Sequence, residues 1–488
     1  MFTVYGTNLG PSVLTAVSGY PLNTALAGTS IRVTAGGRTF DALPYYTSSN
    51  QLAAILPSTT PIGAATLTVT YNGATSAAAA LTVAGNNVGL YAVNSQGTGE
   101  AVVTFPDFSY VTSSNAAHPG DIVILWANGL GPITGDDALP LVSADMANVP
   151  LEILIGGRPA QVLFRGRNSC CASLDQINVR IPEGAIGCRT PVTLKIGNLV
   201  SNTLVIPTAA SGANCTPSFR PTSTEAFHAL LARPSVSVAA LTMLRNLFIT
   251  RDASGALTSS RSDGGSGFFY RIPRPQPFSV GAYADTPPIG TCSVGSGGGL
   301  PAGTLVNLDA GASLTVTGPN GNRTIAQFAG APNFAYSGML GAGVTGNFLD
   351  PGAYTIRGAG GGDIAAFSAP ITIPQPLQWT NQDSSHSVNR ANGLRVTWTG
   401  GDPEGYVLIS GQSTVGQATA RFDCYARSLA GEFTVPPAVL LALPAPSTNG
   451  TVSVVGQTAG AAFQGSGVDY GRILFGSQNA NLGTVSFQ

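Results

Sequence analysis

Short runs of alternating hydrophobic and polar residues fill most of the chain, separated by Gly, Pro, Asn and Asp. A period of two is typical of β-strands, and this punctuation is typical of the turns between them. Residues 2–5 predict a first strand, which “GTNLGP” ends. The repeated helical segments that a parallel sheet needs are missing, and only residues 222–233 predict a short helix. We therefore expect an all-β protein with one short helix.

The first 210 residues contain one pattern twice. The matching segments are “VYGTNLGP” (4–11) with “LWANGLGP” (125–132), “IRVTAGGRTFDALPYY” (31–46) with “LEILIGGRPAQVLFRG” (151–166), and “NQLAAILPSTTPIGAATLTVTYNGATS” (50–76) with “DQINVRIPEGAIGCRTPVTLKIGNLVS” (175–201). In each copy a Gly-Gly pair, Gly36-Gly37 or Gly156-Gly157, predicts a hairpin turn with positive φ.

This pattern resembles the IPT/TIG immunoglobulin-like module, on the “G.NLGP” turn, the “GG.PA” hairpin and the “(D/N)QIN..(V/I)P” segment. The tandem arrangement resembles large uncharacterised secreted proteins of soil bacteria. The resemblance implies serial immunoglobulin-like β-sandwich domains and an extracellular or cell-surface location, and it implies no established activity. The expected domains are an IPT/TIG-like module lacking its first strand (1–84), a second such module with a disulfide loop (85–210), a β-rich domain with a short N-terminal helix (222–375) and a C-terminal β-sandwich (376–488).

The second copy has a lead-in strand within residues 101–126, and the first copy has none. Phe2, Thr3, Val4 and Tyr5 are therefore expected to form an unpaired edge beside a vacancy. Two explanations stay open. Either the natural chain has an upstream strand, or another segment supplies the strand by addition to the edge.

The C-terminus, residues 481–488, alternates like a strand and carries no charged side chain. Head-to-tail insertion of such a segment would build a homopolymer. The candidate donor residues are Leu482, Thr484, Val485, Ser486 and Phe487, which could insert in cis or from the next subunit.

Six cysteines, an even number without a CxxC pair, predict disulfides and an oxidising compartment, with free buried thiols as the alternative. Cys170 and Cys171 are adjacent, so we expect them to pair with Cys188 and Cys215 in an order that the sequence leaves open. Cys292 is expected to pair with Cys424.

Charged residues make up only 9% of the chain and the net charge is −1. A nucleic-acid partner and a polybasic membrane surface are therefore not expected, and no apolar stretch is long enough for membrane insertion.

Catalytic, cofactor-binding and metal-binding residues are not predicted. His118, His228 and His386 share no local motif, and no GxSxG segment is present. The acidic turns at Asp136-Asp137 and at Asp402 and Glu404 lack the spacing of an EF-hand, so we interpret them as solvated turns rather than calcium sites.

Three functional hypotheses follow. The first is a non-catalytic extracellular structural protein, a filament or surface subunit that assembles with itself by β-strand addition. The second is an adhesin or an array that binds surface glycans, for which Tyr45-Tyr46 and Phe268-Phe269-Tyr270 are candidate aromatics. The third is a non-catalytic fragment of a secreted enzyme.

Overall fold

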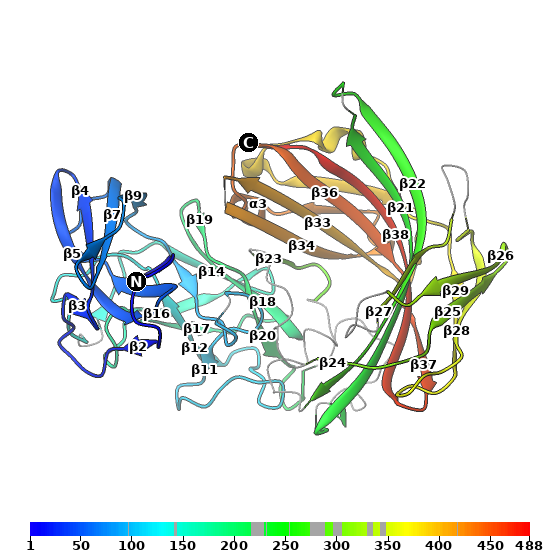
Figure 1. The fold of residues 1–488 in the computed structure, drawn as a ribbon, viewed down its shortest axis with the longest axis horizontal. Coiled ribbons are helices and arrows are strands. Elements are labelled where there is room, and N and C mark those ends of the chain that lie inside the picture. Colours follow the sequence, from blue (N-terminus) through cyan, green and yellow to red (C-terminus); the bar gives the residue numbers. More distant parts are fainter. Residues whose placement is uncertain are drawn as a thin grey trace.

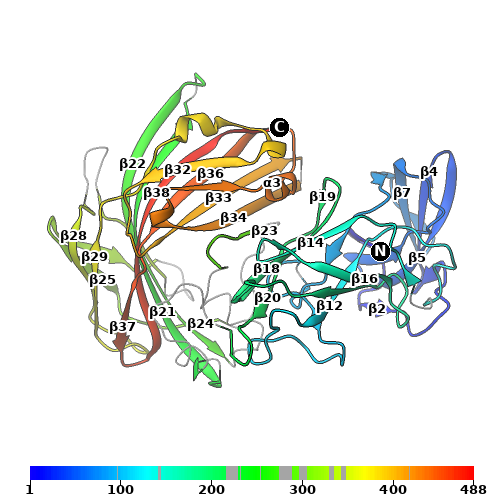
Figure 2. The same cartoon turned by 180° about the vertical axis from the view of Figure 1, so that it is seen from behind.

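A computed structural model describes residues 1–488 except 96, 141–143, 216–228, 231, 253, 274–287, 296–304, 329–334, 342–347 and 417. Figures 1 and 2 show the first module (residues 1–84, blue) at one end of an elongated molecule. The second module (residues 85–210) follows it, and the C-terminal unit (the described residues from 229 onward) occupies the other end.

The first module is a sandwich whose strands are joined in the order β1-β6-β5-β4-β7-β8, with β2, β3 and β9 attached at the sides. Strand β5 belongs to both layers, because residues 38–42 pair with β4 and residues 43–47 pair with β6. The strands are β1 (Phe2–Tyr5), β2 (Thr15–Ala16), β3 (Ala25–Leu26), β4 (Thr29–Ala35), β5 (Arg38–Thr47), β6 (Gln51–Ile55), β7 (Gly63–Tyr71), β8 (Ala74–Thr75) and β9 (Ala79–Val83).

The second module packs two sheets, with the orders β10-β12-β17-β16-β13 and β15-β14-β18-β19; β11 adds to β12 and β20 adds to β18. Its strands are β10 (Gly89–Leu90), β11 (Val103–Thr104), β12 (Ile122–Asn128), β13 (Ala144–Asp145), β14 (Leu151–Ile155), β15 (Arg158–Pro159), β16 (Gln161–Arg167), β17 (Asp175–Arg180), β18 (Gly187–Ile196), β19 (Leu199–Val200) and β20 (Leu204–Thr208).

The two modules repeat each other in register. Val4 pairs with Leu52 as Leu125 pairs with Ile177, and the pairing of β7 with β9 matches that of β18 with β20. The predicted Gly-Gly turns have positive φ, 56° and 74° at Gly36 and Gly37. The internal repeat is therefore present in the backbone as well as in the sequence.

The C-terminal unit is built on one long, curved sheet with the order β23-β34-β33-β36-β38-β21-β22-β24, to which β27, β31 and β37 add. Two smaller sheets, β26-β25-β28-β29 and β30-β32-β35, cover it. The long-sheet strands are β21 (Ser235–Arg251), β22 (Leu257–Pro273), β23 (Cys292–Gly295), β24 (Val306–Asn307), β27 (Ala335–Met339), β31 (Ser387–Val388), β33 (Tyr406–Val415), β34 (Ala418–Arg427), β36 (Ser447–Gln457), β37 (Ala461–Gly465) and β38 (Val468–Phe487). The covering strands are β25 (Ser313–Gly318), β26 (Gly321–Ala326), β28 (Gly352–Gly358), β29 (Phe367–Ile373), β30 (Gln378–Trp379), β32 (Leu394–Thr399) and β35 (Glu432–Val435).

Strand β38 joins the two cores of this unit. Ile473 and Phe475 lie in the core under the four-stranded cover, whereas Val485 and Phe487 lie in the core under β30-β32-β35. β38 also pairs in parallel with β21 from Val238↔Tyr470 to Ile249↔Asn481. Backbone pairing therefore crosses the domain boundary expected at residue 375.

Each core lies between two facing layers, and alternate strand residues fill it. Trp379 and Trp398, which face each other across β30 and β32, are 5% and 3% exposed. The protein is all-β and consists of serial immunoglobulin-like β-sandwiches.

Helix is sparse among the described residues. Besides Ala229 and Leu230, it comprises α3 (Pro437–Leu441) and the 3-10 turns η1 (Gln382–His386), η2 (Arg390–Asn392) and η3 (Ser428–Ala430). Of the predicted helix over residues 222–233, Ala229 and Leu230 are helical, and residues 222–228 and 231 lie outside the described part. Helix α3 was not predicted from the sequence.

The predicted donor strand is not free. Residues 482–487 form the end of β38, where Val485 pairs with Gly450, and Phe487 pairs with both Ser447 and Val388. Val485 and Phe487 are fully buried. The C-terminus lies in the C-terminal unit, whereas the N-terminus lies in the first module (Figures 1 and 2). The prediction that this segment inserts at β1 is therefore wrong, because extracting it would open its own core.

Candidate functional site: the open side of the first module

The first module lacks a cover that the second module has. In the second module, β10 and β11 both pair with the outer edge of β12. The first-module counterpart of β12 is β1, which pairs with β6 and with no other described strand. The edge predicted at Phe2–Tyr5 thus lies at the border of its sheet.

The opposite sheet is also unpaired on this side. In the second module, Ala101 N–H donates to the carbonyl of Val205 and Val205 N–H donates to that of Gly99, which ties the lead-in to β20. The counterpart of β20 is β9, which pairs only with β7 among the described strands. Every residue of β20 is buried, but only Val83 of β9 is. We call this uncovered flank between β1 and β9 the open side.

The side chains of β1 are less buried than those at the matching positions of β12, which β10 and β11 cover. Val123 and Leu125 of β12 are both 0% exposed, and the side chains of Val88, Leu90 and Val103 share their core. Phe2 and Val4, at the matching positions of β1, are half-buried. Among the described residues, no strand covers the apolar side chains of Phe2 and Val4 at the open side.

A cavity of about 470 Å³ lies at the open side, between the two modules. Its apolar wall comes from the first module and includes Phe2, Val4, Leu67, Leu81 and Val83. Its polar end comes from the second module and includes Asn128, Asp137, Arg167 and Ser173. The size and the mixed lining are those of a binding cavity.

The polar end is held rigidly. Arg167 forms an ion pair with the fully buried carboxylate of Asp175, and its Nη2 donates to the carbonyl of Gly131 at 2.7 Å. Asp137 accepts hydrogen bonds from Ser58 N–H at 2.7 Å and from Ser58 Oγ at 2.8 Å. The Arg167 bonds lie within the second module, and the two Ser58–Asp137 bonds join the second module to the first.

The amine of Met1 also lies at the polar end, 3.0 Å from Ser173 Oγ and 3.4 Å from Asn128 Oδ1. Burial, and then the positive charge of Arg167, lower the pKa of this amine from 8.0 to about 5, against the opposing effect of Asp137. The amine is therefore neutral at pH 7.

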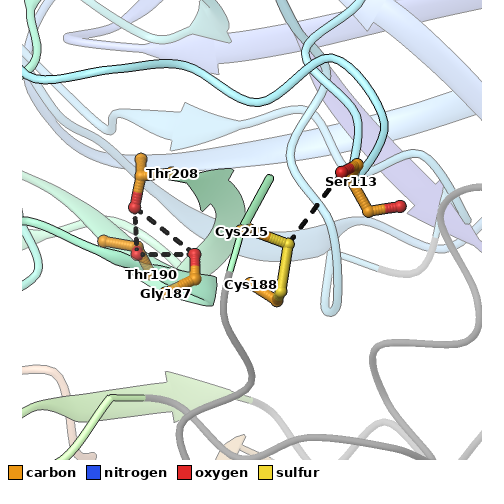
Figure 3. The surroundings of a disulfide bond; sticks show 6 residues. All are labelled: Ser113, Gly187, Cys188, Thr190, Thr208 and Cys215. Atoms are coloured by element: carbon orange, nitrogen blue, oxygen red, sulfur yellow. Dashed lines mark hydrogen bonds between the residues drawn. A yellow bond between two sulfur atoms is a disulfide. The ribbon is translucent and has the colours of Figure 1, made fainter. Parts of the chain in front are cut away.

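All six cysteines form disulfides, Cys170–Cys171, Cys188–Cys215 and Cys292–Cys424. The Cys292–Cys424 prediction is confirmed, since these residues face each other across β23 and β34. Figure 3 shows Cys188–Cys215 beside the paired hydroxyls of Thr190 and Thr208.

The predicted pairing of the first four cysteines is wrong, because β17 lies between the two pairs. Cys170 and Cys171 precede β17 and Cys188 follows it, which separates them by about 20 Å of strand. The Cys170–Cys171 loop contacts the first module instead: Ala172 N–H donates to the hydroxyl of Tyr20 at 3.1 Å, and Ala172 packs in a small core with Leu22, Leu43 and Ile55.

The other candidate groups have structural partners. His118 Nδ1 is 3.1 Å from Asp121 Oδ2, and His386 Nδ1 donates to the carbonyl of Thr484 at 3.2 Å. His228 lies outside the described residues. Within the described part of the chain, no cluster of His, Cys, Asp and Glu is suited to hold a metal ion.

The acidic turns bond to backbone groups near them. Asp136 accepts from Ala138 N–H, and Asp402 accepts from the N–H groups of Glu404 and Ala459. The described residues include no helix that could cross a membrane.

In the aromatic cluster Phe268-Phe269-Tyr270, neighbouring side chains point to opposite faces of the strand, as strand alternation requires. Phe269 is 1% exposed in the core, and its neighbour Phe268 is 47% exposed on the other face. The sequence does not predict the polar end of the cavity, because Asp137, Arg167 and Ser173 share no local motif and meet the first module only through the fold.

No family model matches the chain, and no curated protein matches it. Among solved structures, 65 chains match. A Bacteroides ovatus mixed-linkage glucan utilization locus protein, SGBP-B, in complex with a mixed-linkage heptasaccharide, is 11% identical, with 88% of this chain and 85% of that chain covered and a TM-score of 0.15. Domains 4 and 5 of the S-layer protein SbsC are 13% identical, with 38% and 71% covered and a TM-score of 0.13. The I9–I11 tandem of titin is 9% identical, with 74% and 92% covered and a TM-score of 0.12.

Proposed function

We propose that the protein is a non-catalytic extracellular structural protein, built on IPT/TIG-like modules, whose open side accepts an extended strand from a partner chain. One observation carries this proposal. The two modules share one register, and the flank that residues 88–117 cover in the second module is uncovered in the first. The three disulfides support an oxidising location outside the cytosol.

The second module supplies the template for the bound strand. Residues 99–104 first run parallel to β20, through the bridge Glu100↔Val205, and then antiparallel to β12, through Val103↔Leu125. The matching acceptor positions in the first module are Ala80 on β9 and Val4 on β1. A six-residue segment with Ala and Val at its inward positions would close both sheets at once.

Assembly of the protein with itself belongs to this proposal, with a second copy as the partner chain. The donor then lies outside residues 481–488, because those residues are buried in their own core.

A peptide of residues 97–106, labelled with a fluorophore, tests the acceptor. The expected result is saturable binding to the whole protein, with loss of binding in Val4→Arg, which places a charge in the open side. The matched control is Thr3→Arg, because Thr3 faces outward on the same strand. A peptide with Ala101→Asp and Val103→Asp should not bind. If the native and the Asp-substituted peptides bind equally, or if the native peptide does not bind, the proposal that the open side accepts a strand is falsified.

Self-assembly is tested separately by sedimentation velocity of the whole protein. Concentration-dependent oligomers that Val4→Arg dissociates are expected. A protein that stays monomeric while it binds the peptide would retain the acceptor and exclude a second copy as donor.

A further inference from the structure

A second candidate site lies on the outer face of the second module, away from the cavity. After β11 the chain turns at residues 105–109 and returns, with Val111 N–H donating to the carbonyl of Val103 and Thr104 bridging to Tyr110. Val103 and Val111 are 1% and 2% exposed, so the base of this small hairpin is anchored in the core.

The tip of the hairpin presents an aromatic ring to solvent. Phe108 is 62% exposed and its φ is +64°, a left-handed conformation that bulky residues rarely adopt. The turn that imposes it is closed by Phe108 N–H donating to the carbonyl of Phe105 at 2.9 Å and Phe105 N–H donating to that of Ser109 at 2.8 Å. Such strain at an exposed residue is typical of a binding position.

The Phe108 ring is stacked against the half-buried indole of Trp126, with centroids 6.3 Å apart and an angle of 22° between the ring planes. Trp126 Nε1 donates to Thr104 Oγ1 at 3.2 Å, which fixes the indole. The indole therefore supports one face of the Phe108 ring, and Phe108 remains 62% exposed at the protein exterior.

The single charged side chain in the hairpin segment favours a neutral ligand rich in hydroxyl groups. Asp107 is the only charged side chain between residues 101 and 117. Its Oδ1 accepts from Ser109 N–H at 2.9 Å and Ser109 Oγ at 2.6 Å, which positions the carboxylate next to Phe108. One carboxylate repels acidic polymers and is too little to hold a basic one, but it accepts hydrogen bonds from hydroxyls.

We propose that Phe108, supported by the stacked indole of Trp126, forms a stacking platform for a neutral oligosaccharide. The apolar C–H face of a sugar ring would lie on the exposed part of the Phe108 ring, and ring hydroxyls would donate to Asp107. This site is independent of strand addition, because Phe108 and Asp107 lie outside the lining of the cavity.

Tryptophan emission provides a specific readout. Of the three tryptophans, Trp379 and Trp398 are buried in the C-terminal unit, so a ligand-dependent change reports on Trp126. Cellohexaose, xylohexaose and mannohexaose are titrated into the whole protein. At least one should produce a saturable change, and Phe108→Ala should weaken its binding roughly five- to tenfold.

The matched control is Phe328→Ala, which removes an aromatic ring that is 67% exposed elsewhere and should leave binding unchanged. Asp107→Asn should weaken binding less than Phe108→Ala does. Thermal unfolding of each variant shows whether it is folded. The proposal is overturned if no hexasaccharide changes the emission at millimolar concentration, if Phe108→Ala binds normally, or if Phe108→Ala alters only sedimentation, which would identify a protein contact.

Discussion

Val4 and Leu125 occupy the same place in the two N-terminal modules, yet Leu125 is fully buried and Val4 is half-buried. The difference arises from the strands β10 and β11, which cover only the second module. Truncation of the two side chains should therefore have unequal effects. Leu125→Ala is expected to destabilise the second module by about 2–5 kcal/mol, and Val4→Ala the first module by less than about 1 kcal/mol. Chemical unfolding of both variants measures the two losses of stability.

Binding of the peptide of residues 97–106 should increase the effect of Val4→Ala on stability. If this effect is the same with and without the peptide, the open side is not the binding site of the peptide.

Much of the fold could be predicted from the sequence, because strand alternation and Gly-Gly turns are local signals. The repeat and the edge strand at Phe2–Tyr5 follow from such patterns. The end of β38 alternates in the same way, and nothing local distinguishes a free strand from one in the middle of a sheet. The end of β38 pairs with Ser447 and Gly450 of β36 and with Val388 of β31, and these partners lie 35 to 99 positions earlier in the chain.

Residues 251–267 show how packing can override composition. Their Ser, Gly and Asp content predicts a mobile loop, but residues 257–267 belong to β22. The glycines are needed because a Cβ at Gly265 would lie 2.5 Å from Ile325 Cδ1, and one at Gly267 would lie 2.8 Å from Leu314 Cδ1.

This close approach leads to a matched pair of substitutions. Gly265→Ala should destabilise the C-terminal unit by roughly 1–3 kcal/mol through overpacking. Gly264→Ala, on the opposite face, should be nearly neutral, because its Cβ would make an ordinary contact at 3.6 Å. The midpoints of urea unfolding compare the two. Equal midpoints would show that the core can relax around a larger residue.

The disulfides should contribute unequally to stability. On the chain-entropy model, the 132-residue separation of Cys292 and Cys424 corresponds to about 5 kcal/mol, and the 27-residue separation of Cys188 and Cys215 to about 3.6 kcal/mol. Double Cys→Ser variants of each pair, compared by denaturant unfolding, are expected to follow this order. The reverse order would mean that native packing around Thr190 and Thr208 outweighs loop closure.

The Met1 amine makes stability depend on pH. Its pKa is about 5 in the folded chain and 8.0 as an ordinary value, so between these limits the unfolded chain binds a proton that the folded chain does not. Stability should therefore rise as pH increases from 5 to 8, and the dependence should flatten outside this window. The amine is partly accessible, so screening by solvent reduces the full value of ~4 kcal/mol to roughly 2 kcal/mol. Urea unfolding at pH 5.5 and pH 8 measures the change, with an N-acetylated chain as the control. If acetylation leaves the slope between these pH values unchanged, other groups cause it, and the amine is not buried against Asn128 and Ser173.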